Sequence, residues 1–286
     1  MRGPASQIVV VTGATAGIGL VTALNLASAG MRVVALGRNP ARIDAADASI
    51  RAAVTEPDLH WICADFASLA EVRRASDEIG GVCDRIDILI NNAGNQLVDR
   101  NMTVDGFEMT YQVNHLAPFL MTARLLPSLM RSERPQVITL SSVGHSMIED
   151  MVWDDLQLEN DFSAFKAYAQ SKLANVLFTR ELARRTAATG LVASAVHPGL
   201  VASDFPNKSD AYVRDYYRDA LARGEALTTE QGADTVVWLA QDAGNGTPSG
   251  GYFHARERIA PSAAASDPTS AERLWAISEI QTASFL

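Results

Sequence analysis

The sequence predicts an α/β fold in which a doubly wound parallel sheet of about seven strands is flanked by helices. Short β-branched runs alternate along the chain with longer segments of helical character. Such alternation is typical of a parallel sheet covered on both faces. The run Ile86–Ile90 is apolar everywhere except Asp87, as expected of a strand that is buried on both faces.

The expected strands are short and rich in β-branched residues. The first, Ile8–Val11, is β-branched throughout and ends at a turn that contains Gly13. The later strands have the same apolar character, and each is separated from the next by a helical segment. They are expected at Arg32–Leu36, His60–Ala64, Ile86–Ile90, Val137–Leu140, Val192–Val196 and around Tyr252.

The expected helices are recognised by the residues at their ends. Asn39 and Pro40 are typical of an N-cap followed by proline at the first helical position. Ser68 and Glu71 have the spacing of a capping box. The helices are therefore expected at Leu20–Ala29, from Pro40 onward, from Ser68 to Gly80, and at Tyr111–Met130, Phe162–Thr186, Thr229–Leu239 and Ala271–Ile280.

A single domain over residues 1–286 is the simplest organisation, because the sequence shows neither an internal repeat nor a linker. One segment, 204–228, is too long for a routine connection and is rich in Asp, Arg and Tyr. We expect it to be an insertion on the substrate side of the fold, with a helix of its own.

The composition excludes several classes of protein. The net charge of −9 argues against a general nucleic-acid binder, which needs a basic surface. Cys63 and Cys83 form no disulfide framework, and the five histidines lack the spacing of a metal site. No leader and no long apolar run is evident. We therefore expect a cytoplasmic protein without a metal site, a membrane anchor or a nucleic-acid partner.

A glycine-rich loop, Thr12–Gly19, connects the first strand to the first helix. Its spacing is G-x-x-x-G-x-G. Glycines at such a place let the backbone approach a pyrophosphate, whose charge then lies at the N-terminus of the helix. The loop alone is a moderate signal, and an ordinary glycine-rich turn is the alternative.

The end of the second strand indicates which dinucleotide the loop would bind. A site for NAD has an acidic residue there that binds the ribose 2′-hydroxyl. The residues present are Leu36, Gly37 and Arg38, and the arginine is suited to a 2′-phosphate. The sequence therefore favours NADP(H), with a solvated arginine at a strand end as the alternative.

Further motifs follow the expected strands in order. Asp65 follows the third strand, Asn91-Asn92-Ala93-Gly94 the fourth, and Pro198-Gly199 the sixth. Between them lie Asn114, Ser142, Tyr168 and Lys172. Through these motifs, nearly the whole chain resembles the short-chain dehydrogenase/reductase family, which has a Rossmann fold.

The resemblance is strongest to the retinol-dehydrogenase-like branch of that family. It rests on Asn114–Leu116, Ser141–His145, Ser171–Phe178 and His197–Gly199, and also on Arg273–Trp275 with Ser278 and Glu279. Two features depart from the branch. Its members are often membrane-anchored, whereas no anchor is evident here, and Ser203 stands where the family often has threonine.

The resemblance implies a catalytic set and a set of cofactor-binding residues. It implies that the protein is a homodimer or homotetramer and that Asp65 holds the adenine. The catalytic residues would be Asn114, Ser142, Tyr168 and Lys172. The residues that bind NADP(H) would be Gly13, Thr15, Gly17, Ile18, Gly19, Arg38, Asp65, Phe66, Asn92, Ala93, Gly94, Tyr168, Lys172, Pro198, Gly199, Val201 and Ser203.

The chemistry of the catalytic residues can also be argued from their types and spacing. Tyr168 and Lys172 are four residues apart and share a helix face. A nearby ammonium favours the phenolate, so we expect Lys172 and the positive nicotinamide to lower the pKa of Tyr168. Ser142 would donate to a substrate carbonyl oxygen, whereas Ser141, its neighbour in the strand, faces the other way. Asn114 is either a helix-kink residue or a core hydrogen-bonding residue or, by resemblance, holds a water that links Lys172 to solvent.

The predicted function is hydride transfer between NADP(H) and a carbonyl or alcohol group of a fairly apolar small molecule, with Tyr168 giving or taking the proton. A non-catalytic NADP(H) sensor or scaffold is the alternative, and an epimerase or dehydratase ranks last. Retinoids, steroids, aromatic ketones and polyketide-like intermediates all remain open as substrates. His145 is a candidate for the border of the substrate site. Five aromatic residues either line that site or pack the insertion: Trp153, Phe205, Tyr212, Tyr216 and Tyr217.

Overall fold

The computed structural model describes residues 7–202, 211–241 and 246–286, and its centre is one eight-stranded sheet. The strand order is β3-β2-β1-β4-β5-β6-β7-β8, with the first seven strands parallel and β8 antiparallel to β7. The strands are β1 (Ile8–Val11), β2 (Arg32–Gly37), β3 (Leu59–Cys63), β4 (Ile88–Asn91), β5 (Gln136–Leu140), β6 (Val192–Val196), β7 (Gly251–His254) and β8 (Glu257–Ile259).

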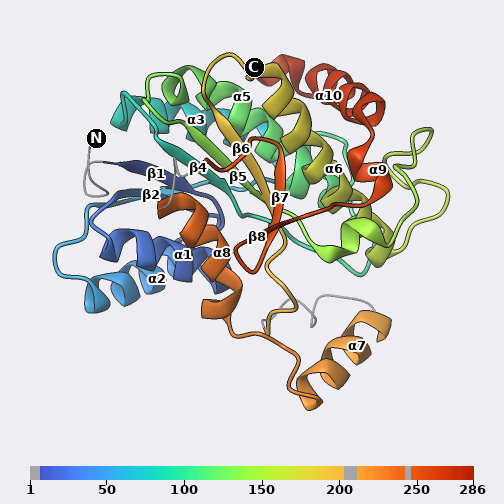
Figure 1. The fold of residues 1–286 in the computed structure, drawn as a ribbon, viewed down its shortest axis with the longest axis horizontal. Coiled ribbons are helices and arrows are strands. Elements are labelled where there is room, and N and C mark those ends of the chain that lie inside the picture. Colours follow the sequence, from blue (N-terminus) through green and yellow to red (C-terminus); the bar gives the residue numbers. More distant parts are fainter. Residues whose placement is uncertain (1–6, 203–210, 242–245) are drawn as a thin grey trace.

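Helices cover both faces of the sheet, which confirms the predicted doubly wound fold (Figure 1). One face packs against α1 (Gly17–Ser28), α2 (Pro40–Ala53) and α8 (Thr229–Gln241). The other packs against α3 (Leu69–Val82), α5 (Ala117–Leu129) and α6 (Ala164–Arg185). Successive residues of β1 alternate between the two cores: Val9 and Val11 face the first, and Val10 faces the second.

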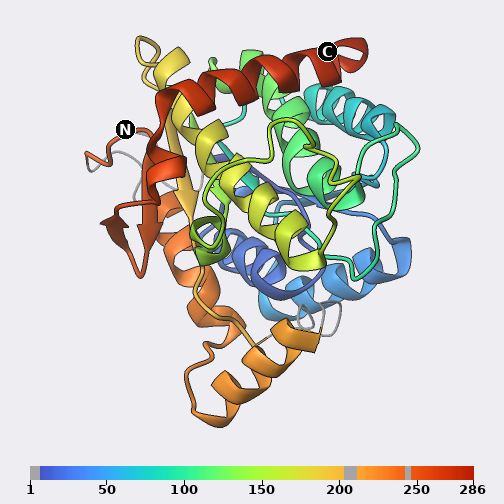
Figure 2. The same cartoon turned by 90° about the vertical axis from the view of Figure 1, so that its right-hand side faces the viewer.

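The C-terminal part of the chain adds a further layer outside α6. It consists of α9 (Ala263–Ser266) and α10 (Pro268–Thr282), and Figure 2 shows α10 crossing the outer side of the molecule. Another helix, α7 (Ala211–Ala222), lies apart from the sheet and its covering helices (Figure 1). It falls within the segment predicted to be an insertion. Residues 203–210 of that region lie outside the described residues.

The eighth strand is an addition to the seven that were expected. Strand β8 pairs with β7 through a two-residue turn, Ala255 and Arg256, whose φ angles are 48° and 63°. Positive φ at both positions is the geometry of a tight hairpin turn that usually requires Asn or Gly. Because Ala-Arg lacks that signature, the sequence did not reveal the hairpin.

The predicted helix Tyr111–Met130 is interrupted near its beginning. A short turn, α4 (Met109–Tyr111), continues into a π-helical turn, Gln112–Leu116, before α5 begins. Pro118 lies four residues after Asn114 and has no N–H to donate to the Asn114 carbonyl. A widened turn at this point is the expected response. The predicted helical stretch is therefore confirmed, and its irregular turn lies at Asn114, where a helix kink was one of the expected alternatives.

None of the helices within the described ranges has both the length and the apolar character needed to cross a membrane.

Candidate active site

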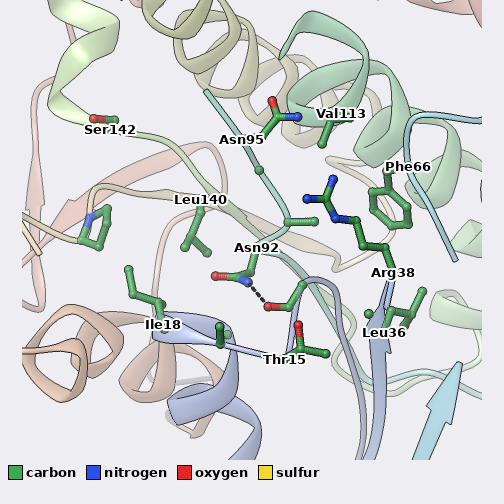
Figure 3. A pocket seen from close by; sticks show the side chains of 18 of the residues that line it. Thr15, Ile18, Leu36, Arg38, Phe66, Asn92, Asn95, Val113, Leu140 and Ser142 are labelled. Carbon is green, nitrogen blue, oxygen red and sulfur yellow. Dashed lines mark hydrogen bonds between the residues drawn. The ribbon is translucent and has the colours of Figure 1, made fainter. Parts of the chain in front are cut away.

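A cavity of about 340 Å³ lies at the carboxyl ends of the strands, where the strand order reverses between β1 and β4 (Figure 3). Such a switch point is where open α/β sheets bind ligands. The cavity wall contains Ser142 and all the predicted cofactor-binding residues except Ser203, which lies outside the described residues. It also contains residues that were not predicted: Ala16, Leu36, Gly37, Arg42, Ala64, Asn95, Val113, Leu140 and Ser141.

The glycine loop is held against the end of β4 by hydrogen bonds. The Asn92 side chain donates from Nδ2 to the carbonyls of Thr12 and Gly13, at 2.8 and 3.1 Å. The Thr12 hydroxyl accepts from the backbone N–H groups of Asn92 and Ala93, both at 3.0 Å. A Cβ on Gly19 would come within 2.3 Å of Asn92 Nδ2. The close contact therefore requires glycine at position 19.

The N-terminus of α1 opens into this cavity. Ala16 is the N-cap and provides no side-chain hydrogen bond, and the first turn contains no acidic residue. Gly17 has a φ of 54°, and a Cβ placed on it would meet no atom within 4 Å. The backbone N–H groups of this turn are thus left to a ligand, and an anion is the ligand that they favour.

Two arginines stand at the end of β2. Arg38 is exposed and lines the cavity beside Phe66 (Figure 3). Arg42, in the first turn of α2, lines the same cavity. Arg42 was not among the residues predicted from the sequence. Arg42 lies four residues after Arg38, and this spacing could have revealed it. Asn39, which caps the helix between them, accepts through Oδ1 from Arg42 N.

Ser142 and Ser141 point in different directions at the end of β5. Ser142 caps a short 3₁₀ turn, Val143–Ser146, and its Oγ accepts from the N–H of Gly144 at 3.1 Å. The buried hydroxyl of Ser141 donates instead to the carbonyl of Lys172 at 2.7 Å. Because Oγ of Ser142 already accepts one hydrogen bond, its own proton is well placed to be donated to another group.

Tyr168 and Lys172 lie one turn apart on α6, as the sequence predicts. Lys172 Nζ is 5.5 Å from the centre of the Tyr168 ring and donates to the carbonyl of Leu140 at 3.0 Å. Burial raises the pKa of Tyr168 to about 12, while a hydrogen bond with Ser142 acts in the opposite direction. Burial lowers the pKa of Lys172 to about 8.

The ammonium of Lys172 lies 5.5 Å from the centre of the tyrosine ring and donates to the Leu140 carbonyl. The expected lowering of the Tyr168 pKa by Lys172 together with the nicotinamide stays a prediction, because it requires the bound cofactor. The lowering that the side chains contribute comes from Ser142. With its pKa near 12, Tyr168 is a protonated acid at neutral pH.

Asn114 lies in the π-helical turn and does not line the cavity. Its side chain is fully buried, and Nδ2 donates to Asn95 O and to Ser171 Oγ, both at 2.9 Å. Its Oδ1 accepts from Asn95 N at 2.7 Å. Asn114 thus joins the loop after β4 to α6, in agreement with a core hydrogen-bonding residue. The water predicted by resemblance stays a prediction.

Trp153 is the one of the five aromatic candidates whose side chain the structure describes, and it has a packing role. The Trp153 indole donates to Asp150, lies under the Arg273 guanidinium and packs in the core next to α6 and α10. Phe205 lies outside the described residues, as do the side chains of Tyr212, Tyr216 and Tyr217.

Comparison with known proteins identifies the family. The short chain dehydrogenase family model matches residues 7–212. Mouse retinol dehydrogenase 12 is 37% identical over 275 residues, which cover 95% of this chain and 85% of the relative. A protein of known structure from Mycobacterium paratuberculosis superimposes with a TM-score of 0.80 at 31% identity, covering 99% of this chain and 96% of the other. The RhlG/NADP active-site complex from Pseudomonas aeruginosa has a TM-score of 0.69 at 26% identity, covering 88% and 97%.

The chain therefore belongs to the short-chain dehydrogenase/reductase family and resembles its retinol dehydrogenases. It is an oxidoreductase that uses a nicotinamide dinucleotide and acts on a small molecule. The residues present fit such a cofactor. The uncapped start of α1 and the open side of Gly17 suit its pyrophosphate, and the cavity extends from there to Tyr168 and Lys172.

Proposed function

We propose that the protein is an NADP(H)-dependent oxidoreductase that interconverts a carbonyl and an alcohol group of a fairly apolar small molecule. The observation that carries the choice of cofactor is the pair Arg38 and Arg42, both in the cavity wall at the end of β2. A ribose 2′-phosphate is the group that two guanidinium groups at this position would bind. The complex of RhlG with NADP is consistent with this choice.

In the proposed reaction, the protein binds the substrate oxygen and supplies its proton. The glycine loop, Arg38 and Arg42 would hold the cofactor, which would supply or accept the hydride when bound. Ser142 donates its hydroxyl proton to the substrate oxygen as a hydrogen bond. Tyr168 gives that oxygen its proton in the reduction, which suits a phenol that is protonated at neutral pH. Lys172 is fixed by the Leu140 carbonyl and would help to hold the cofactor through its ribose.

Two observations support an apolar substrate. Val143 and Met147 lie one and five residues after Ser142, and both are exposed although they are apolar, at 47% and 53%. Mouse retinol dehydrogenase 12 is named for an apolar alcohol. Retinol and its aldehyde are therefore the first compounds to try. A cytoplasmic location and a homo-oligomeric assembly belong to the same proposal.

The proposal is tested by cofactor binding followed by turnover. We expect the purified protein to bind NADPH more tightly than NADH in calorimetry. We also expect it to oxidise NADPH with retinal or another member of a panel of apolar aldehydes and ketones. Tyr168→Phe removes the proton donor, so this variant should bind NADPH normally and lose turnover.

Three other outcomes of these measurements would contradict the proposal in different ways. Tight NADPH binding without turnover of any panel member would favour a cofactor sensor. Near-normal turnover by Tyr168→Phe would show that another group supplies the proton. Failure to bind either cofactor would overturn the proposal.

A further inference from the structure

We propose that His145 is a positioning residue that holds Ser142 in place and connects it to the C-terminal segment of the chain. The inference rests on the proposed function, because it concerns the serine that would contact the substrate oxygen. His145 itself is 3% exposed and does not line the cavity. It would therefore act through Ser142 and not by contact with substrate.

Both ring nitrogens of His145 are engaged by the backbone. The N–H of Ser262 lies 3.1 Å from Nε2, and Nδ1 lies 2.8 Å from the carbonyl oxygen of Ser142. A backbone N–H can only donate and a carbonyl can only accept. Nε2 is thus the acceptor and Nδ1 carries the proton, so the two contacts together select one neutral tautomer.

The contact matters because Ser142 lies just beyond the sheet. The last ladder bond of β5 runs from Ser141 N to Val196 O at 2.7 Å. Past this point, the carbonyl of Ser142 accepts from the backbone N–H of His145 at 3.1 Å and from its ring. The ring therefore supplies a second restraint on the peptide that orients Oγ of Ser142 towards the cavity.

The ring is in turn held by β7. The Tyr252 ring meets His145 edge-on, with centroids 4.9 Å apart, and its hydroxyl lies 3.3 Å from Nδ1. His197 also stacks on Tyr252 at a centroid distance of 6.4 Å, and His254 stacks on His197 at 4.3 Å. Burial lowers the pKa of His145, which keeps the ring in the neutral form that both contacts need.

Two amide substitutions separate the two contacts. In His145→Asn, the amide nitrogen can occupy the place of Nδ1 and donate to Ser142, but no acceptor reaches Ser262. In His145→Gln, the amide oxygen can reach the place of Nε2 and accept from Ser262, but the donor to Ser142 is lost. Both variants remove the aromatic ring, so each controls for the lost packing in the other.

We expect the two variants to differ in turnover and in the position of Ser142. With all-trans-retinal as the probe aldehyde, kcat of His145→Gln should fall roughly ten-fold or more while the Kd of NADPH is unchanged. The kcat of His145→Asn should stay within about three-fold of the wild type. Crystal structures of the variants with NADPH should show Ser142 displaced in His145→Gln and in place in His145→Asn.

Equal losses of kcat in the two variants, or an unmoved Ser142 in both structures, would overturn the inference. A residue needed only for packing would affect the melting temperature of both variants alike and would not separate their kcat values. The Tyr168→Phe variant is measured in parallel. Its turnover decides the proposed function, whereas the crystallographic comparison decides the role of His145 without any substrate.

Discussion

Lys172 brings an ammonium group into a position that is only 5% exposed, and the location has a cost for folding. The carbonyl of Leu140, which accepts from both Lys172 and Asn175, compensates part of that cost. Burial still lowers the pKa of the lysine to about 8. At neutral pH the protein therefore holds a charge that would be more stable in water, as is common where function opposes stability.

A pH dependence of stability follows for Lys172→Met. The pKa of the lysine is about 8 in the folded protein and 10.5 as its ordinary value, so the unfolded chain binds more protons between these pH values. The free energy of unfolding of the wild type should therefore rise relative to Lys172→Met as the pH increases from about 8 to 10.5. Urea unfolding of both proteins without cofactor measures this difference, and parallel pH curves would contradict it.

Arg38 allows a residue-scale test of cofactor choice. Arg38→Asp removes one guanidinium from the end of β2 and adds a carboxylate of the kind that an NAD site has there. We expect NADPH affinity to fall roughly ten- to hundred-fold and NADH affinity to be kept or increased, as measured by calorimetry. Arg51→Ala is the matched control, because Arg51 pairs with Asp47 on the same helix away from the cavity. An unchanged ratio of the two affinities in Arg38→Asp would remove Arg38 from the proposed site.

At the scale of elements, the connection between β1 and α1 depends on atoms from β4. The strand–loop–helix order and the glycine spacing are evident in the sequence, and they were sufficient to predict the loop. The contact of Gly19 with Asn92 was not evident, because it joins residues that lie far apart in the chain. The irregular turn at Asn114 has a local signal in Pro118, whereas the bonds of the Asn114 side chain to Asn95 and Ser171 join distant parts of the chain and were not evident.

A pair of glycine substitutions tests the loop. In Gly19→Ala, the new Cβ would lie 2.3 Å from both Asn92 Nδ2 and Gly13 O, so the loop or Asn92 must move. We expect a loss of about 1–3 kcal/mol in the free energy of unfolding and weaker cofactor binding. Gly80→Ala, at an exposed position of α3 with no neighbouring atom within 4 Å, should instead stabilise the protein by about 0.5–1 kcal/mol. Chemical denaturation and calorimetry measure both, and identical behaviour of the two variants would contradict the proposed loop contact.

At the scale of the whole molecule, α10 covers the outer side of α5 and α6 (Figure 2). The Trp275 ring stacks on Phe178 with centroids 5.8 Å apart and meets the Phe119 ring edge-on at 5.0 Å. The Arg185 guanidinium lies 4.7 Å from the tryptophan ring. This helix lies beyond residues 7–212, the part matched by the family model. The contribution of α10 to stability therefore has to be measured on this chain itself.

Removing the tryptophan measures what this packing contributes. Because Trp275 is half-buried, Trp275→Ala should lower the free energy of unfolding by about 2 kcal/mol, below the range for fully buried aromatic residues. Ile280→Ala on the same helix is the control, since Ile280 is 77% exposed and should change stability by less than about 0.5 kcal/mol. Urea unfolding monitored by circular dichroism compares the two, and equal midpoints would show that α10 does not stabilise the protein through Trp275.

The sequence by itself determined the fold class, and it predicted the glycine loop and, with the family resemblance, the candidate set Ser142, Tyr168 and Lys172, which the structure brings to one cavity. These features depend on local patterns: strand runs, glycine spacing, and a pair of residues one helical turn apart. Parallel strands then bring their carboxyl ends to one edge of the sheet, so residues that follow the strands meet there.

Only the tertiary structure decided the β8 hairpin, the second arginine in the cavity, the raised pKa of Tyr168 and the tautomer of His145. Each of these depends on burial or on an atom far away in the chain. The contact of His145 with Ser262, for example, joins residues 117 positions apart. A pattern of residue types records which groups are present in a protein, whereas desolvation and hydrogen bonding depend on what surrounds each group once the chain has folded.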